Sequence, residues 1–487
     1  MNPKKLREYV YEIEPEMKVV RYNNKIYNFQ MKVPSVIYAN DSLIEHIVKD
    51  GSLDQLTNVA CLPGIKGKAI AMSDAHQGYG FPIGGVAATD INEGAISPGG
   101  VGYDINCGVR LLNTGLSFQE INPRIPDLLA GLFENVPSGL GSKGKLRISP
   151  QDLNNIMELG IEWAIGQGFG FDEDRYFVED NGLMQGVDSN IVSQTAKQRG
   201  LRQIGSLGSG NHFIEIQKVE EIYDPISAKV MGIELGQITV MIHTGSRGLG
   251  HQIATDAINM LQQSMEKENV VAPDMQLSYC LGSSKEAEKY LSLMRAAANF
   301  AFVNRHIIMH WVRETFNQVL NLKPEDIKVV YDIAHNILKQ EEHVVDGKRY
   351  KLNVHRKGAT RALPPEYPEI PKKYYSIGQP ILIPGSMGTS SYLCVGQPDS
   401  MKLSFASTAH GAGREMSREK AKRQFRDNQI KDQLAKRGIM VMAASREVVS
   451  EEAPLAYKNI DAVVDISHNL GILKKVAKLA PIAVTKG

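Results

Sequence analysis

Cysteine and an excess of charge of either sign are scarce in this sequence. Its 487 residues contain 4 cysteines, too few and too scattered for a disulfide framework, so we expect reduced thiols in a cytoplasmic protein. The 55 Lys and Arg residues nearly balance the 54 Asp and Glu residues, so any nucleic-acid binding must depend on local basic patches. No stretch approaches about 18 uncharged apolar residues, and the N-terminus lacks the apolar segment of a signal peptide, so we expect a protein that is not membrane-bound.

Glycine, in contrast, is abundant. The chain has 44 glycines in 487 residues, about 9%, against a usual share of about 7%. The hydrophobic share of 43% and the charged share of 22% are those of a globular protein and exclude disorder, collagen and coiled coil. The length would allow about three ordinary domains or one large one. Because no repeat or linker divides the chain, we predict a single domain over residues 1–487.

Two segments have helical patterns. Residues 27–50 predict a strand followed by a helix that an Asn-Asp-Ser cluster caps. Residues 283–321 predict a long helix, which a capping box at Ser283 begins. His306 and His310 lie one turn apart in that helix, but the segment is otherwise a core helix, so we expect them to pack or to hydrogen-bond rather than to bind metal.

Short β-type runs broken by glycine make up much of the remainder. Residues 238–245, 327–336 and 342–358 are predicted strands, the last with Asp346 and Gly347 as a hairpin turn. Strands and helices mix without regular alternation, so the predicted fold class is α+β, with mixed sheets flanked by helices in one large domain.

Residues with metal-binding chemistry recur in the glycine-rich segments. Asp104 and Cys107 form a D-x-x-C pair within residues 73–110, a weak signal alone because buried cysteines are common. Four histidines then follow, each where a β-type run meets a turn of small residues: His212, His243, His335 and His410. Together these residue types suit a transition-metal centre in which a thiolate can bridge two ions. A closed structural zinc site generally uses compact ligand pairs, so an open catalytic site is the better interpretation.

Other segments suggest phosphate and RNA binding. The turn at residues 381–393 lacks a Walker lysine but could cradle phosphate with backbone N–H groups and hydroxyls, although a plain turn is about equally consistent. Residues 348–361 carry six Lys and Arg and no acid, and residues 414–437 carry nine against four acids. The second segment is predicted to form a helix over 417–437 that ends at Gly438. The alternative to RNA binding is that its charges only form a solvated helix face.

The motif series resembles one known family, the RtcB RNA ligases. It runs through SDAHQGYGFPIGG, GGVGYDINCGVR, SLGSGNHFIEI, HTGSRGLGHQ, YDIAHN, VHRKGATRA, PGSMGTSSY and HGAGR to the terminal PIAVTKG. The resemblance implies an RtcB-like fold and a GTP-dependent ligase that uses two Mn²⁺ ions. It would join a 2′,3′-cyclic phosphate or 3′-phosphate RNA end to a 5′-hydroxyl end in tRNA splicing and RNA repair. Implied partners are RNA, GTP and, in some lineages, the activator archease, with the enzyme acting as a monomer.

The resemblance also implies the roles of particular residues. His410 would attack the GTP α-phosphorus, and the guanylyl group would then pass to the RNA 3′-phosphate. The implied metal ligands are Asp104, Cys107, His212, His243 and His335, with Cys107 shared by both ions. The implied nucleotide-binding residues are Asn211, His212, Phe213, Ile214, Glu215, His335, Asn336, Pro384, Gly385, Ser386, Met387, Ser391, His410, Gly411, Ala412, Gly413, Tyr457 and Lys486.

Asp74 is the expected partner of His410. An imidazole attacks phosphorus through an unprotonated nitrogen, which stays free when the other nitrogen carries the proton and donates it to an acceptor. A carboxylate is the strongest such acceptor, and Asp104 is committed to metal, which leaves Asp74. The alternative is that Asp74 only caps its turn.

Two other functions compete with the ligase. One is a binuclear phosphodiesterase with His410 as acid or base and no use of GTP. The other is a metal-stabilised RNA-binding protein without catalysis. A covalent GMP adduct distinguishes the ligase from both.

Overall fold

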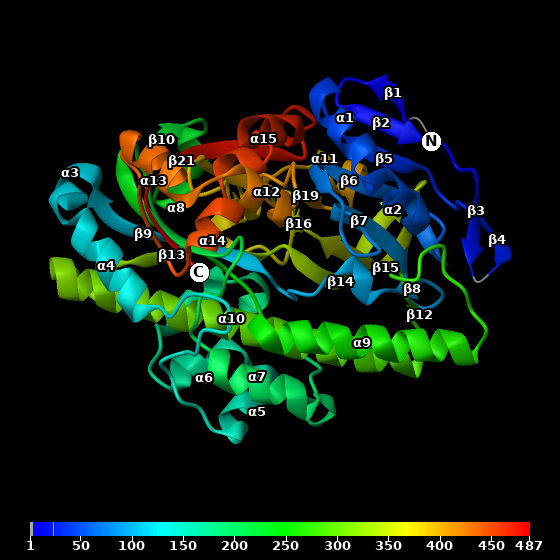
Figure 1. Cartoon of the computed structure of the whole chain (residues 1–487), viewed down its shortest axis with the longest axis horizontal. Coiled ribbons are helices and arrows are strands. Elements are labelled where there is room, and N and C mark those ends of the chain that lie inside the picture. The colour runs from blue at the N-terminus through cyan, green and yellow to red at the C-terminus, as the bar shows by residue number, and fades with distance from the viewer. Residues whose placement is uncertain (1–2, 23) are drawn as a thin grey trace.

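Two large sheets form the centre of the molecule, and helices flank them (Figure 1). The structure is a computed structural model that describes residues 3–22 and 24–487. The first sheet contains, in spatial order, β1 (Lys4–Arg7), β2 (Val10–Ile13), β5 (Ser35–Tyr38), β6 (Ile65–His76), β7 (Ile83–Asp90), β15 (Lys348–Lys357) and β14 (Asn336–Val345). The second contains β13 (Lys328–Ala334), β9 (Gly108–Ser117), β11 (Gln237–Thr244), β10 (Phe213–Ile222), β21 (Leu473–Lys486), β18 (Ser391–Gly396) and β17 (Pro380–Ile383), with β20 (Met440–Ala443) beside β21.

Three two-stranded sheets and the helices complete the fold, which confirms the predicted mixture of sheets and flanking helices. The small sheets pair β3 (Met17–Tyr22) with β4 (Lys25–Gln30), β8 (Ala95–Ile96) with β12 (Cys280–Leu281), and β16 (Ala359–Arg361) with β19 (Ser407–Ala409). The α-helices are α1 (Asp41–Lys49), α2 (Ser52–Val59), α3 (Phe118–Ile121), α4 (Ile125–Asn135), α5 (Pro150–Leu159), α6 (Ile161–Gly166), α7 (Gln194–Gln203), α8 (Pro225–Met231), α9 (Arg247–Lys267), α10 (Lys285–Leu320), α11 (Asp399–Ser404), α12 (Arg418–Gln424), α13 (Asp427–Lys436), α14 (Arg446–Glu451) and α15 (Ile460–Asn469).

The candidate site residues of the second sheet lie along one edge, where the strands begin or end. The strands β13, β9, β11, β10 and β21 are successive antiparallel neighbours, so starts and ends of strands alternate along each edge. His243 pairs with Phe213, and Phe213 pairs with Lys486. Segments far apart in the sequence therefore deliver their polar residues to the same edge.

The two sheets are joined at His335. The chain leaves the second sheet after β13 and enters the first as β14, which turns through Asp346 and Gly347 into β15. Both turn residues have positive φ, 49° and 77°, as the two-residue turn of a hairpin requires. The predicted hairpin is confirmed, and His335 lies where the sheets meet.

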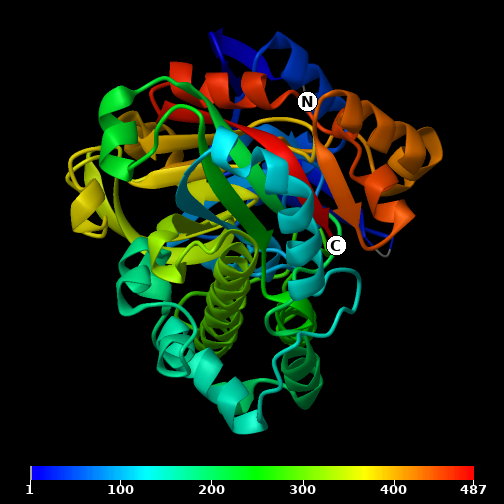
Figure 2. The same ribbon diagram turned by 90° about the vertical axis from the view of Figure 1, so that its left-hand side faces the viewer.

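The long helix α10 supports this edge. Figure 1 shows α9 and α10 running side by side beneath the sheets, and Figure 2 looks along α10. Its N-cap is Ser284, whose hydroxyl accepts from the Ala287 N–H at 3.1 Å, one residue later than the box predicted at Ser283. The Ser283 N–H instead donates to the Asn92 carbonyl at 2.9 Å.

The predicted helix over 417–437 is wrong as a single element. It is divided into α12 and α13, because Phe425 is extended (φ −113°, ψ 138°) and packs against an apolar core cluster. Packing of this partly buried ring against the core outweighs helix continuity. The predicted stop at Gly438 is confirmed, since this glycine follows α13 with φ 76°.

Candidate active site

Asp104 and Cys107 lie on the loop that leads into β9. The loop contains Asn106 with φ 52°, a left-handed conformation that Asn tolerates better than most residues. Arg305 of α10 donates to the Asn106 carbonyl at 2.8 Å and to its Oδ1 at 3.0 Å. Asp332 in turn accepts from Arg305 at 2.8 and 2.9 Å. A buried ion pair therefore fixes the loop from beneath.

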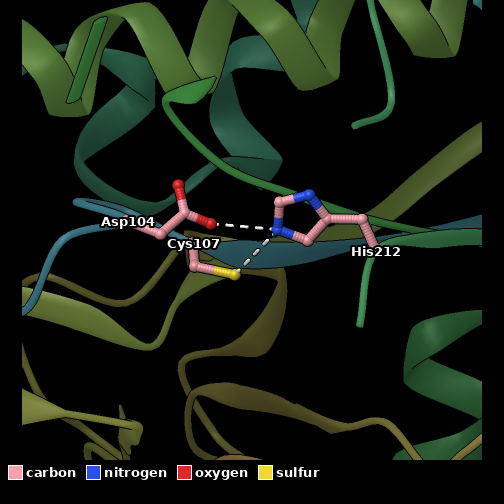
Figure 3. A group of neighbouring side chains, drawn as sticks. All are labelled: Asp104, Cys107 and His212. Carbon is pink, nitrogen blue, oxygen red and sulfur yellow. Dashed lines mark hydrogen bonds and ion pairs between the residues drawn. The ribbon is translucent and has the colours of Figure 1, made fainter. Parts of the chain in front are cut away.

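Asp104 and Cys107 of this loop and His212 from the segment before β10 point toward one another (Figure 3). Their ligand atoms lie within 4.8 Å of one another. Nε2 of His212 is 2.9 Å from Oδ2 of Asp104 and 3.6 Å from Sγ of Cys107. Burial, and next the Asp104 carboxylate, raises the pKa of the Cys107 thiol well above its ordinary value. The thiolate therefore needs a bound cation to form.

The tautomer of His212 tests whether this group fits a metal ion. Its Nδ1 lies 3.1 Å from the Leu207 carbonyl, an acceptor, so Nδ1 carries the proton and Nε2 carries a lone pair. A lone pair and a carboxylate 2.9 Å apart repel each other unless a proton or a cation lies between them. Carboxylate, thiolate and imidazole are together a transition-metal donor set. The residues present fit a metal ion, and the Leu207 carbonyl orients the imidazole for it.

His243 and His335 extend the group toward His410. Nε2 of His243 is 3.3 Å from Cys107 Sγ, and the centroids of the His243 and His335 rings are 5.3 Å apart. Burial first, and nearby positive charge second, lowers the pKa of both well below the ordinary value, so both rings are neutral. Nδ1 of His335 lies 3.0 Å from Thr360 Oγ1, while its buried Nε2 has no hydrogen-bond partner among the described residues. A neutral imidazole with a free nitrogen suits metal ligation.

His410 contacts the buried Asp74. Oδ2 of Asp74, which lies in β6, is 2.6 Å from Nδ1 of His410 and accepts from the His410 main-chain N–H at 2.9 Å. Burial alone would raise the pKa of Asp74, but the contacts with His410 and the charge of Lys458 hold it below its ordinary value. An ionised Asp74 keeps the proton on Nδ1 and leaves Nε2 of His410 with a lone pair.

A cavity of about 580 Å³ lies over these groups. Its wall includes most of the residues that the sequence predicted for metal or nucleotide binding. These are Asp104, Cys107, Asn211, His243, His335, Asn336, Pro384, Gly385, Ser386, His410, Gly411, Ala412, Gly413, Tyr457 and Lys486.

The other predicted residues lie behind the wall. Gln217 donates to Glu215 at 2.5 Å and to Ser391 at 3.2 Å, and Ser391 accepts from the main chain of the 384–386 turn. Burial raises the pKa of Glu215 to about 8, and its Oε1 has no partner within the described part of the chain. The side chains of three further residues belong to the apolar core: Phe213, Ile214 and Met387.

Glu452 is a site residue that sequence reasoning missed. It is buried and accepts from Arg414 at 3.1 Å and Arg418 at 3.4 Å, with Lys486 Nζ at 3.6 Å and the Tyr457 hydroxyl donating to it. Burial opposes its charge, but these cations lower its pKa. The acid follows an ordinary short helix, and no motif marks it. Only the fold shows that it orders the basic side of the cavity.

The basic segment 348–361 is divided between surface and interior. Arg356 pairs with Glu341 at 2.7 Å, and Arg361 pairs with Glu369 at 2.6 Å. Lys357 reaches the cavity wall, where burial lowers its pKa to about 7. Within this segment, only the part near the β14–β15 turn exposes its charges.

Comparison with known proteins identifies similar chains over nearly the whole length. A family model described as tRNA-splicing ligase RtcB matches residues 55–487. The tRNA-splicing ligase RtcB of Aeropyrum pernix is 53% identical over 461 residues, which cover 94% of this chain and 96% of the relative. The proteins of the same name from Thermococcus kodakarensis and Pyrobaculum aerophilum are 52% and 50% identical, covering 96% and 99% of this chain and 98% and 99% of the relatives. In residues 3–22 and 24–487, no helix has the length and apolarity needed to cross a membrane.

Proposed function

The chain belongs to the RtcB family of tRNA-splicing ligases, and we propose that it is a GTP- and manganese-dependent RNA ligase that acts in tRNA splicing and RNA repair. It would join a 2′,3′-cyclic phosphate or 3′-phosphate end to a 5′-hydroxyl end. The observation that carries this proposal is the contact of His410 with the buried Asp74, with His410 in the wall of the cavity that also exposes Asp104 and Cys107 of the metal-ligand cluster.

His410 has the arrangement of a nucleophile. With the proton on Nδ1 and directed at Asp74, Nε2 can attack the α-phosphorus of GTP. The new N–P bond forms as the bond to the β-phosphate oxygen breaks, and pyrophosphate leaves. Positive charge then grows on the ring, and the Asp74 carboxylate, 2.6 Å away, stabilises it.

The later steps return His410 to its starting state. Where the RNA ends in a 2′,3′-cyclic phosphate, water first hydrolyses it to a 3′-phosphate. An oxygen of this 3′-phosphate attacks the guanylyl phosphorus, and the N–P bond to His410 breaks. The 5′-hydroxyl of the second RNA then attacks the activated 3′-phosphate and releases GMP.

Metal ions would be held by Asp104, Cys107, His212, His243 and His335. They would supply positive charge that lets phosphates converge despite their mutual repulsion. Lys486 and Arg414, aligned by Glu452, add fixed cations to the same wall. The thiolate and imidazole ligands alone would favour Zn²⁺ over Mn²⁺, so manganese rests on the family.

The guanosine nucleotide would lie against the turn at 384–386 and the loop at 410–413, with Asn211 and Asn336 beside it. Glu215 and Ser391 stand behind that turn, where the free Oε1 of Glu215 could accept from a guanine base. We also propose that the chain acts as a single domain and as a monomer, with archease as an activator.

The test is the intact mass of the protein after incubation with GTP and Mn²⁺. A gain of one GMP that His410→Ala abolishes is the expected result. No adduct on a metal-loaded protein would overturn the proposal and favour a phosphodiesterase or a non-catalytic RNA-binding protein.

A further inference from the structure

Three aromatic rings contact one another in sequence beside the cavity, and the proposed function gives them no role. Tyr79 and Tyr103 are half-buried and form part of the cavity wall. Their ring centroids are 5.4 Å apart, edge to face, and Tyr103 stacks on His251 with centroids 4.9 Å apart and an interplanar angle of 26°. His251, on α9, is exposed. The row therefore runs from the cavity out to the surface.

The loop that carries Tyr79 is fixed from three directions. Gln55 exchanges two hydrogen bonds with the main chain of the preceding residue, at 2.7 and 2.9 Å. Gln276 accepts from the main-chain N–H of the following residue at 3.0 Å. Lys357 donates to the Tyr79 carbonyl at 2.8 Å. A rigid mounting for a half-exposed aromatic ring lowers the entropy lost when a ligand stacks on it.

The segment that packs beside His251 on α9 is basic, and Asp256 of α9 accepts from its Ser193 at 2.6 Å. Residues 189–214 contain Lys197, Arg199 and Arg202 and no Asp or Glu. This segment includes α7, which packs on α9, and the Arg199 side chain lies against Gly248, three residues before His251. Positive charge beside an aromatic row is the combination that binds single-stranded nucleic acid, with the cations near phosphates and the rings stacked on bases.

We propose that Tyr79, Tyr103 and His251 form a stacking platform for nucleobases next to the RNA ends that the enzyme joins. This proposal rests on the proposed function. Every base has a stacking face, so such a platform holds RNA without selecting a sequence. Tyr103 directly precedes Asp104, so a base on this row places its phosphate near the metal-ligand cluster. The nucleotide-binding turn and loop lie on other elements and leave this part of the wall for RNA.

The test measures the dissociation constants of single-stranded RNA for Tyr79→Leu, His251→Leu and Tyr79→Phe. We expect both leucine variants to bind about tenfold more weakly, because one base–aromatic stack contributes about 1–3 kcal/mol. Tyr79→Phe should bind as wild type does, and the salt dependence should not change in any of the three, because no ionic contact is lost. The matched control is Tyr176→Leu, which removes a tyrosine that is 54% exposed and outside the cavity wall.

A second arm replaces the terminal nucleotide of either RNA strand by an abasic one. In one strand the abasic site should weaken wild-type binding about tenfold and should add little to the loss in Tyr79→Leu. The platform proposal would be overturned if the leucine variants bind RNA as tightly as Tyr176→Leu does. It would also be overturned if the loss of affinity from the abasic nucleotide adds fully to the loss in Tyr79→Leu. If Tyr79→Leu fails to fold, the exposed His251→Leu decides. The GMP adduct of the wild-type protein is measured in parallel, so failure of the proposed function is seen separately.

Discussion

His306 on α10 and the cavity histidines His243 and His335 are equally buried, yet their surroundings differ. Burial lowers the pKa of all three, that of His306 to about 3. Both nitrogens of His306 are used, since Arg110 donates to Nδ1 at 3.0 Å and Nε2 donates to the Phe169 carbonyl at 2.9 Å. Each of the two cavity histidines has a buried nitrogen without a partner in the described structure.

The difference teaches that burial and a lowered pKa do not by themselves identify a ligand. An unpaired buried nitrogen indicates one only where it also lies at the cavity, since Nδ1 of His343 and Nδ1 of His355 are unpaired in the described structure but lie outside the cavity wall. A buried polar atom left unpaired costs about 1–3 kcal/mol, which a fold tolerates where a ligand later supplies the partner. The prediction that His306 packs or hydrogen-bonds is confirmed. The same holds for His310, which pairs with Glu314 at 3.3 Å and packs edge to face on Trp311.

The largest effect is expected at the proposed nucleophile, His410. Asp74→Ala should lower the rate of guanylylation by at least about 10²-fold, because His410 loses the acceptor that fixes its tautomer. GTP binding and metal content should stay nearly intact. Single-turnover formation of the adduct, followed by intact mass, measures the rate.

The control reaction begins with RNA whose 3′ end already carries the guanylyl group. Its transfer to a 5′-hydroxyl should suffer much less in Asp74→Ala, since His410 no longer has to attack. Adduct formation at the wild-type rate would show that Asp74 only caps its turn.

Two buried cysteines, Cys107 and Cys394, allow a proposed metal ligand to be compared with a core residue. Cys107→Ser should keep the fold but lose most bound metal and ligation, because a neutral hydroxyl is a poor substitute for a thiolate ligand. The matched change Cys394→Ser lies in β18 in an apolar cluster and should keep its metal. Metal content and melting temperature are measured together on both. Equal metal content in the two variants would exclude Cys107 as a ligand.

The buried ion-pair cluster beneath the site should respond in stability instead. Asp332 accepts from Arg110 at 2.7 Å and from Arg305 at 2.8 Å, and all three side chains are fully buried. Asp332→Asn leaves two buried guanidinium groups without their acid and should lower the free energy of unfolding by about 3–5 kcal/mol. Denaturant unfolding of Asp332→Asn and Cys107→Ser measures the contrast. An unchanged midpoint in Asp332→Asn would mean that the pair contributes little.

Local patterns in the sequence predicted what local physics determines. The hairpin at Asp346 and the long helix follow from turn chemistry and hydrophobic period, and the glycine-rich motifs marked the candidate metal ligands. The nucleotide-binding residues of the cavity wall were expected from the family resemblance. Glu452 was not predictable, because its role comes from cations brought together from distant segments. The break at Phe425 was also missed, since helix propensity does not reveal that this ring packs against residues distant in the sequence.

The smallest effect is expected in the salt dependence of RNA binding, which should differ between variants of the two basic segments that the sequence predicted to bind RNA. Lys420, Arg423 and Arg426 are exposed on α12 and the adjoining turn, close in sequence to cavity residues Arg414 and Arg418. Replacing these three by alanine should weaken RNA binding about equally for all sequences and lower the salt slope by roughly 0.7 for each lost contact.

The matched control changes Lys348, Arg349 and Lys351 to alanine. Lys348 lies nine residues along β15 from Lys357 at the cavity, a distance of roughly 30 Å at about 3.4 Å per residue, so this triple variant should change the slope less. Titration of one single-stranded RNA at several salt concentrations gives both slopes. A larger change of slope in the variant of Lys348, Arg349 and Lys351 would assign RNA binding to the β14–β15 hairpin instead. If both variants keep the wild-type slope, neither segment binds RNA and both are solvated surface.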